Sequence, residues 1–361
     1  MGDARHMRRA IELAAPHRTH PNPKVGAVVV DESGKVVGEG AHLGVGRPHA
    51  EVVAIGEAGD KARDSTLHVT LEPCTHQGHT PPCAGAVVEA GVRKVVIGAI
   101  DPDPRVSGAG VSWLRDAGLE VETGILEQDA EAVDPAYFHH RRTGLPLVTW
   151  KAAMTLDGSV AATDGTSQWI TSEEARQDAH RLRSVMDAIV VGAGTFRADD
   201  PLLTARIEGV ETQPVAVVVA GRQSLPTDRK IWERSPLVIS ARPLGVPSGE
   251  VVVVGGENEW PDPVESARAL SDRGLLDVLL EGGPQLSGAW WRAGVVGRGV
   301  IYVGPQLAGG RGMAPIEGDF ATMAQSRAVN IKDVRMVGPD IRIEFLPLEG
   351  GVPPQARRRD S

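Results

Sequence analysis

Cysteine is scarce in this sequence. Its 361 residues include two cysteines, and both lie in the twelve-residue segment Glu72–Cys83. An intracellular chain with so few cysteines has no disulfide framework, and placing both beside a His-x-Glu pattern favours metal binding. The segment from His49 to Cys83 is therefore the first candidate for chemistry.

Long apolar runs are also missing. No stretch approaches the length that would cross a bilayer, and residues 1–15 are charged and lack the apolar centre of a signal peptide. We therefore expect a cytoplasmic protein that does not engage a membrane.

Positive charge is in deficit. Lys and Arg total 38 against 47 Asp and Glu, which gives a formal net charge of −9. Binding to a phosphate backbone depends on clustered basic residues, so this balance argues against a nucleic-acid partner. A small-molecule substrate is the expected partner.

The length predicts two domains of ordinary size, and 43 glycines with 26 prolines suit an α/β architecture with short connections. The charged, turn-forming stretch Arg141–Pro146 separates two apolar patterns. We place the domains at 1–144 and 145–347. Residues 348–361 lack periodicity and are expected to form a solvated, disordered tail.

Apolar spacing predicts the elements of the first half. They are a helix over Asp3–Ala15, a hairpin of Lys24–Val30 and Lys35–Glu39, a helix over Ala50–Ala58, a strand over Ser65–Leu71, a helix over Ala84–Ala90 and a strand over Val92–Ala99.

These elements place the candidate metal ligands. His49 and Glu51 open a helix, Cys74 follows a strand, and Cys83 opens another helix, where the positive end of the helix dipole favours a thiolate. His49, Cys74 and Cys83 give zinc three protein ligands and leave the fourth position for a water that the metal activates. Glu51 then takes the proton and passes it to a departing amine.

A structural zinc is the alternative. His76 and His79 lie between the cysteines, and either could close the site to four protein ligands. A closed site would explain neither the position of Glu51 nor its pairing with His49.

The second half predicts strands that end in glycine turns. A strand over Leu147–Met154, a helix over Glu173–Asp187 capped by Thr171 or Ser172, and a strand over Ala188–Val191 come first. Gly192 and Gly194 lack the third glycine of a dinucleotide fingerprint. The better candidate is the strand Leu275–Leu280, the turn Glu281–Pro284 and the helix Gln285–Ala293, whose first N–H groups could receive a pyrophosphate.

Several segments resemble the bifunctional riboflavin-biosynthesis deaminase/reductase family. In the first half they are His49–Glu51, the string Glu72–Cys83, Asn22–Gly26 and Asp101–Val106. The wide spacing of the cysteines matches this family and departs from the Cys-x-x-Cys of nucleic-acid and cytidine deaminases. His79 stands where an arginine is common and Asp103 where an asparagine is common, and both are expected on the substrate side of the site.

In the second half, the matching segments are Lys151–Gly158, Ser167–Thr171, Thr195–Arg206 and Glu281–Gly283. The resemblance implies that NADPH contacts Ala153, Trp169, Thr195, Asp199 and Gly283. It implies that the substrate contacts Ser167, Arg183, Leu203, Arg206 and Glu281. Paired N–H donors of Arg183 and Arg206 suit a phosphate, and Trp169 offers a flat face to a nicotinamide ring, although Trp169 could also be a core residue.

The resemblance further implies an α/β fold with an N-terminal cytidine-deaminase-like three-layer α/β/α domain and a C-terminal dihydrofolate-reductase-like α/β domain. It implies one Zn²⁺ and NADPH as cofactors, a phosphorylated pyrimidine as substrate, and a homo-oligomer. The expected reactions are hydrolytic deamination of a phosphoribosylamino-pyrimidinone and reduction of its ribosyl group to ribityl.

Two other functions remain open from the residues. One is a zinc deaminase of nucleosides or tRNA with an accessory nucleotide-binding domain. The other is a binding protein without activity, with a structural zinc and a bound nucleotide. NADPH oxidation with the deaminated intermediate would distinguish the bifunctional enzyme from the nucleoside or tRNA deaminase. Replacing Glu51 would abolish deamination by an enzyme but would change nothing in a binding protein without activity.

Overall fold

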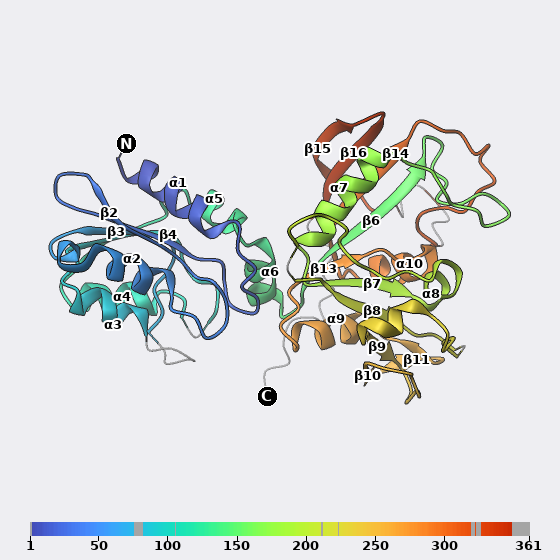
Figure 1. Ribbon diagram of the computed structural model, residues 1–361, viewed down its shortest axis with the longest axis horizontal. Coiled ribbons are helices and arrows are strands. Elements are labelled where there is room, and N and C mark those ends of the chain that lie inside the picture. The colour runs from blue at the N-terminus through green and yellow to red at the C-terminus, as the bar shows by residue number, and fades with distance from the viewer. Residues whose placement is uncertain are drawn as a thin grey trace. The chain divides into compact units, whose positions relative to one another are not determined.

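The computed structural model describes residues 2–75, 82–104, 106–210, 212–222, 224–318, 322 and 326–348. His76, His79 and the predicted tail beyond Leu348 lie outside the described residues. The chain forms two compact units, Met1–Arg142 and Thr143–Ser361 (Figure 1). In the part that the structure describes, no helix is both long and apolar enough to cross a membrane.

Unit 1, Met1–Arg142, is built on a five-stranded sheet of order β2-β1-β3-β4-β5. Its elements are α1 (Gly2–Ala14), β1 (Gly26–Val30), β2 (Val36–Ala41), α2 (Ala50–Ala58), the 3₁₀ turn η1 (Gly59–Ala62), β3 (Thr66–Leu71), α3 (Cys83–Glu89), β4 (Lys94–Ala99), α4 (Ala109–Asp116), β5 (Glu120–Thr123), α5 (Glu127–Ala132) and α6 (Pro135–Thr143). β1 pairs antiparallel with β2 and β3, whereas β3, β4 and β5 run parallel. The predicted hairpin is confirmed.

Helices cover both faces of this sheet. α1 and α5 pack on one face and α2, α3 and α4 on the other, so the unit has the three α/β/α layers that were predicted (Figure 1). Met7, Ala10 and Ala14 recur at helical spacing and are buried, which explains why α1 forms and which side it turns to the sheet. Met7 and Ala10 share a core with Val28 and Val96.

Close contact with β2 fixes the position of α2. A Cβ atom added to Gly38 would lie 2.1 Å from the carbonyl oxygen of Ala54, and one added to Gly40 would lie 2.3 Å from that of Ala50. Only glycine permits this approach, because both contacts are to backbone. The helix that begins beside His49 is thereby held against the sheet.

We predict opposite effects for two alanine substitutions, one at this contact and one on the exposed side of α2. Gly38→Ala should lower the free energy of unfolding by about 1–3 kcal/mol, because the helix must move away from the strand. Gly56→Ala, on the exposed side of α2 with nothing within 4 Å, should raise it by about 0.5–1 kcal/mol through helix propensity. Urea denaturation of both variants measures the difference, and equal effects would contradict the close approach.

One stretch differs from its prediction. Arg141–Thr143, predicted to be a turn, forms the last turn of α6, and Gly144 with φ 75° follows it. The helix continues because Tyr137 and Phe138 are buried against unit 1. Its amphipathic packing therefore outweighs the local turn signal.

Unit 2, Thr143–Ser361, contains a nine-stranded sheet of order β10-β9-β8-β7-β13-β6-β14-β16-β15. Its elements are β6 (Leu147–Thr155), α7 (Glu173–Ser184), β7 (Ala188–Gly192), α8 (Ala193–Asp199), β8 (Val215–Val219), η2 (Lys230–Arg234), β9 (Leu237–Ser240), β10 (Glu250–Val253), β11 (Gly256–Glu257), β12 (Trp260–Pro261), α9 (Pro263–Ser271), β13 (Asp277–Leu280), α10 (Pro284–Arg292), β14 (Val296–Gly304), β15 (Val329–Val337) and β16 (Asp340–Pro347). In the order of the sheet, the strands from β10 through β6 to β14 run parallel, and β16 and β15 complete the sheet antiparallel. β11 and β12 form a separate two-stranded sheet.

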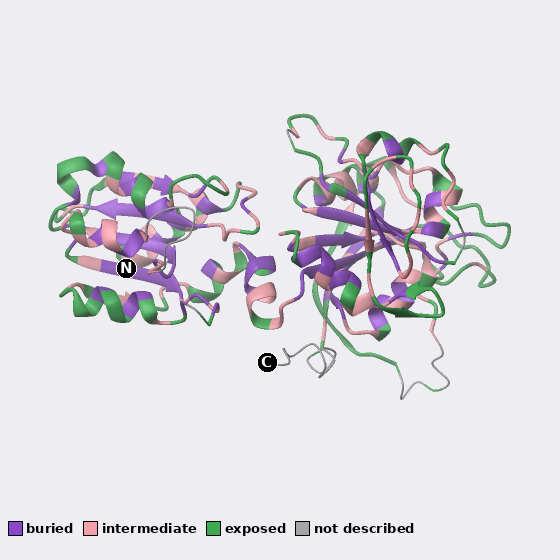
Figure 2. Cartoon of the chain, turned by 90° about the horizontal axis from the view of Figure 1, so that it is seen from below, coloured by how far each residue is buried: buried purple, intermediate pink, exposed green. Residues whose placement is uncertain are grey.

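The central parallel strands of the large sheet are buried on both faces, as expected for parallel strands, whereas the edge strand β15 is exposed (Figure 2). Side chains alternate along each strand: Val278 and Leu280 join a core with α9 and α10, while Leu279 joins a second core with α7 and α8. The predicted α/β class is confirmed. α7 begins as predicted, with Ser172 Oγ accepting from the N–H of Ala175, but ends at Ser184, three residues early.

Candidate active sites

Three predicted ligands converge at one end of unit 1. One donor atom from each of His49, Cys74 and Cys83 lies within 4.8 Å of the others. Cys74 Sγ lies 3.5 Å from His49 Nδ1 and 3.3 Å from Cys83 Sγ. An imidazole nitrogen and two sulfurs form a donor set that suits zinc, and three ligands leave one tetrahedral position open.

Glu51 lies beside these ligands. Its Oε1 is 3.0 Å from Cys83 Sγ, and the side chain is 3% exposed. Burial raises the pKa of its carboxyl group. A buried carboxyl group that is not needed to complete the ligand set can exchange protons with a substrate at this position.

Each ligand and Glu51 lies at the start of a helix or just beyond a strand. His49 precedes the first turn of α2 and Glu51 lies within it, Cys74 lies three residues beyond β3, and Cys83 is the first residue of α3. The N–H of Cys74 donates to Cys83 Sγ at 3.1 Å. Helix starts and a strand end therefore bring together residues that are far apart in sequence.

Glu72 fixes the chain just before Cys74. Its buried carboxylate accepts from the N–H groups of Asp101, Gly108, Gly110 and Val111. The last two belong to the first turn of α4, where a carboxylate is favoured by the helix dipole. The sequence marked Glu72 as part of a motif, but its partners, about thirty to forty residues away, could not be read from it.

The two sulfurs lie within hydrogen-bond distance of each other, and this shifts their pKa values in opposite directions. The hydrogen bond with Cys83 lowers the pKa of the Cys74 thiol to about 4, and the same proximity raises that of Cys83. The hydrogen bond to Cys74 raises the pKa of His49. A divalent cation would replace these protons and hold both sulfurs as thiolates.

Two other segments that carry the resemblance, those of Asn22 and Asp103, contain polar contacts. The Nδ2 of Asn22 lies 3.0 Å from Nε2 of His42, whose ring packs edge-on against His49 at 5.4 Å. Asp103 is buried, and its carboxylate lies 3.6 Å from Nε of Arg141. His79 lies outside the described residues.

In unit 2, the ends of neighbouring strands bring predicted residues together. β7 and β13 are adjacent and parallel, so the turns after them meet. A Cβ atom added to Gly283 would lie 3.6 Å from Thr195 Oγ1. Gly283 precedes α10, whose first turn offers free N–H groups.

A largely but not fully buried ion pair lies beside this turn. Arg183 of α7 donates from Nε and Nη2 to the two oxygens of Glu281 at 2.7 and 2.6 Å, and from Nη1 to the carbonyl of Thr204. The Arg183 and Glu281 side chains are 17% and 10% exposed. The resemblance implied that both contact the substrate, but two of the three nitrogens of Arg183 are already committed to Glu281.

Sequence reasoning missed Lys151 as a member of this group. Lys151 lies on β6, next to β13, and its charge acts on Glu281. Burial alone would raise the pKa of Glu281, but the charges of Arg183 and Lys151 outweigh it and lower the pKa to about 2. Burial lowers the pKa of Lys151 itself. The Lys151–Gly158 motif was a signal that could have suggested this role.

The other predicted residues are distributed around these strand ends. Leu203 is buried, Ser167 is exposed, and the exposed Arg206 donates its backbone N–H to Nδ1 of His180 at 3.2 Å. Burial raises the pKa of Asp199, at the end of α8.

Trp169 and Ala153 lie on the β14 side. Ala153 pairs with Tyr302 near the end of β6, and the Trp169 carbonyl accepts from Gln306, two residues beyond β14. Trp169 is 62% exposed. The interpretation of Trp169 as a core residue is therefore wrong.

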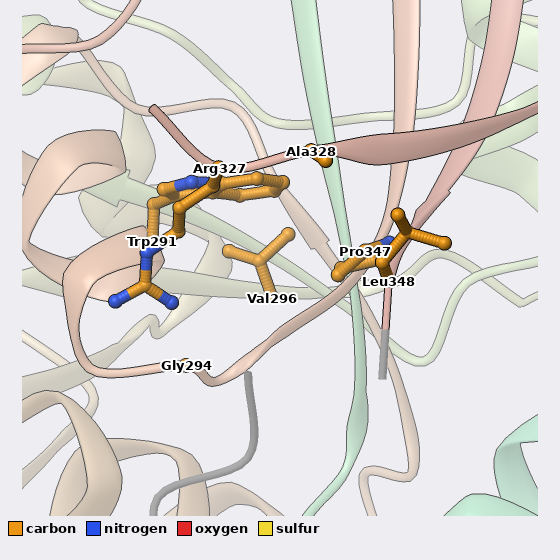
Figure 3. A pocket seen from close by; sticks show the side chains of 7 residues that line it. All are labelled: Trp291, Gly294, Val296, Arg327, Ala328, Pro347 and Leu348. Atoms are coloured by element: carbon orange, nitrogen blue, oxygen red, sulfur yellow. The ribbon is translucent and has the colours of Figure 1, made fainter. Parts of the chain in front are cut away.

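A groove of about 280 Å³ lies at the other end of β14. Trp291, Val296 and Arg327 line it together with Gly294, Ala328, Pro347 and Leu348 (Figure 3). Val296 begins β14 and pairs with Val148 near the start of β6, whereas Ala153 lies near the end of that strand. The groove contains none of the predicted site residues.

Comparison with known proteins matches both halves of the chain. Residues 1–99 match the cytidine and deoxycytidylate deaminase zinc-binding region, and residues 146–343 match the RibD C-terminal domain. The riboflavin biosynthesis protein RibD of Mycobacterium tuberculosis (strain H37Rv) is 43% identical, covering 91% of this chain and 92% of its own. That of Aquifex aeolicus is 38% identical, covering 95% and 98%.

Solved structures give the same result. Acinetobacter baumannii RibD superimposes with a TM-score of 0.88 at 38% identity, over 96% of this chain and 99% of that one. A Thermotoga maritima protein, described as a diaminohydroxyphosphoribosylaminopyrimidine deaminase/5-amino-6-(5-phosphoribosylamino)uracil reductase, superimposes with a TM-score of 0.86 at 32% identity, over 96% and 99%.

Proposed function

Because this chain belongs to the RibD family of riboflavin-biosynthesis proteins, we propose that it performs two consecutive reactions on one small molecule. It deaminates a phosphoribosylamino-pyrimidinone by hydrolysis with Zn²⁺ and then reduces the ribosyl group to ribityl with NADPH. The observation that carries the first step is the buried Glu51 beside the convergent donors of His49, Cys74 and Cys83.

In the first reaction, His49, Cys74 and Cys83 would hold the zinc, and when bound it would supply an activated water as nucleophile. Glu51 accepts a proton from that water and delivers it to the departing amine, so that water is consumed and ammonia released. Burial of Glu51 suits this role, because a raised pKa brings the carboxyl group closer to neutrality and allows it to take and return a proton.

In the second reaction, the turn at Gly283 and the start of α10 would hold the pyrophosphate of NADPH, with Thr195 beside them. The exposed Trp169 would contact the nicotinamide, and the cofactor would supply the hydride. Glu281, kept ionised by Arg183 and Lys151, accepts hydrogen bonds from the ribosyl hydroxyls. Arg206 carries the one predicted phosphate-binding guanidinium that is exposed.

Each of the two reactions is assigned to one unit, according to the residues found there. We assign deamination to residues 1–144 and reduction to residues 145–347. The match to RibD proteins spans both halves and favours this enzyme over a nucleoside or tRNA deaminase and over an inactive binding protein.

Removing the metal should separate the two reactions. With a chelator, ammonia release from the substrate should stop, because the site loses its source of activated water. Supplied with the deaminated intermediate, the same chelated enzyme should still oxidise NADPH, which is followed by absorbance. Added zinc should restore ammonia release, whereas release that continues without metal would overturn the assignment.

We also propose that the enzyme acts in the cytoplasm, as a homo-oligomer, without nucleic-acid or membrane partners. The net charge of −9 supports the absence of a nucleic-acid partner. Light scattering during gel filtration measures the oligomer directly, and a monomer at working concentration would contradict this part of the proposal.

A further inference from the structure

Trp169 combines high exposure with a fixed position. The Arg176 guanidinium carbon lies 4.3 Å from the centre of its ring, within the range of a cation–π contact. The indole nevertheless remains 62% exposed. One face of the ring is therefore covered by a charge, and the exposed area lies away from it.

Arg176 is itself anchored. Its Nη1 donates to the carbonyl of Thr171 at 2.8 Å, and it lies in the first turn of α7. Ser172 caps that helix, and its N–H and Oγ–H donate to Asp340 Oδ2 at 2.8 and 2.6 Å. Since Asp340 begins β16, the guanidinium rests on a helix start that is tied to the sheet.

A second anchor holds the backbone of Trp169. Gln306 Nε2 donates to the carbonyls of Trp169 and Ile170 at 3.0 and 3.2 Å. The loop that carries Gln306 is organised by Asp157, whose carboxylate accepts from the N–H groups of Ala308, Gly309 and Gly310. Side chain and backbone of Trp169 are thus held from two separate elements.

We propose that Arg176 and Gln306 are positioning residues for Trp169, which keep its open face oriented for the nicotinamide ring. The inference rests on the proposed reductase function. Neither residue needs to touch the cofactor: an exposed indole that rotates freely loses conformational entropy when it stacks on a ligand, and an indole that is already held loses less. Both residues therefore act on cofactor affinity through Trp169.

Arg176→Met tests this proposal, since it keeps the side chain's bulk and removes the charge. We expect the KM for NADPH to rise by about 3- to 10-fold, with a smaller change in kcat, as for loss of a cation–π contact. Arg176→Lys should recover part of the affinity. Arg181→Met, at an exposed position on the same helix, is the matched control and should leave KM unchanged.

A double-variant comparison distinguishes positioning from a general effect on the fold. If Arg176 acts through Trp169, adding Arg176→Met to Trp169→Leu should cause little further loss of NADPH affinity. Independent, multiplying effects would overturn the proposal. Gln306→Leu should behave in the same way. Ammonia release by each full-length variant should remain unchanged, which shows that unit 1 is folded, and an unchanged urea denaturation curve shows that unit 2 is folded.

The same measurements separate this inference from the proposed function. If Trp169→Leu leaves the KM for NADPH unchanged, the cofactor role of Trp169 is wrong, and the positioning role falls with it. If Trp169→Leu weakens NADPH binding but Arg176→Met and Gln306→Leu do not, the cofactor role stands and only the positioning role is overturned.

Discussion

Replacing Glu51 by glutamine should abolish ammonia release while zinc content and NADPH oxidation remain. Glutamine has nearly the same shape as glutamate but cannot accept the proton, and positioned acid–base groups contribute about 10²–10⁴-fold to rate. We therefore expect a loss of at least about 100-fold in kcat for deamination. Zinc content by atomic absorption and NADPH oxidation with the deaminated intermediate measure the retained functions.

Cys83→Ser provides the comparison for this variant. It removes a ligand, so both zinc and ammonia release should fall, whereas Glu51→Gln should lose only the reaction. If Glu51→Gln also lost zinc, Glu51 would be a ligand rather than a proton carrier. Deamination within about 10-fold of the unmodified enzyme would show that another group moves the proton.

The ligands of the deaminase site could be predicted because each lies at the end of a helix or strand. A helix start supplies His49, the chain just beyond a strand supplies Cys74, and another helix start supplies Cys83, so apolar periodicity alone placed each ligand at the end of an element. The partners of Glu72 could not be predicted, because hydrogen bonds across about forty residues leave no periodic trace.

The reductase site was harder to predict from the sequence, also because its contacts join distant residues. Arg183 and Glu281 were predicted one by one, yet their pairing spans 98 residues and depends on the sheet order β7-β13-β6. That order also adds Lys151, which the sequence placed on a strand and in a family motif but not in the site. Hydrophobic pattern specifies which face of a strand is buried, but it does not specify which strand becomes the neighbour.

Replacing Glu281 by glutamine should both stop reduction and destabilise unit 2. The change leaves Arg183 and Lys151 without their counter-charge in a buried site, and breaking such a pair costs about 3–5 kcal/mol. NADPH oxidation and urea denaturation measure the two effects. Glu265→Gln is the control, because the Glu265–Arg268 pair on α9 is 49% and 38% exposed and should contribute about 1 kcal/mol or less.

The pH dependence of this effect has a definite sign. The pKa of Glu281 is lowered to about 2 in the folded protein, from its ordinary value of 4.5. Its stabilising contribution is therefore fully present above pH 4.5 and is lost as the pH falls from there towards 2. The unmodified enzyme should lose stability across that range, and Glu281→Gln should lose less.

A double variant separates the two roles of the ion pair. Arg183→Met with Glu281→Leu removes both charged partners, and apolar residues of similar volume in place of a buried pair are often neutral or stabilising. Stability should therefore recover relative to Glu281→Gln, apart from the cost of Lys151 remaining unpaired, while reduction stays absent because the hydroxyl acceptor is gone. Recovery of both stability and NADPH-dependent reduction would show that Glu281 acts only in folding. If Glu281→Gln alone lost no more stability than Glu265→Gln, the Arg183–Glu281 pair would be too solvated to contribute to stability, and the expected cost of about 3–5 kcal/mol would be wrong.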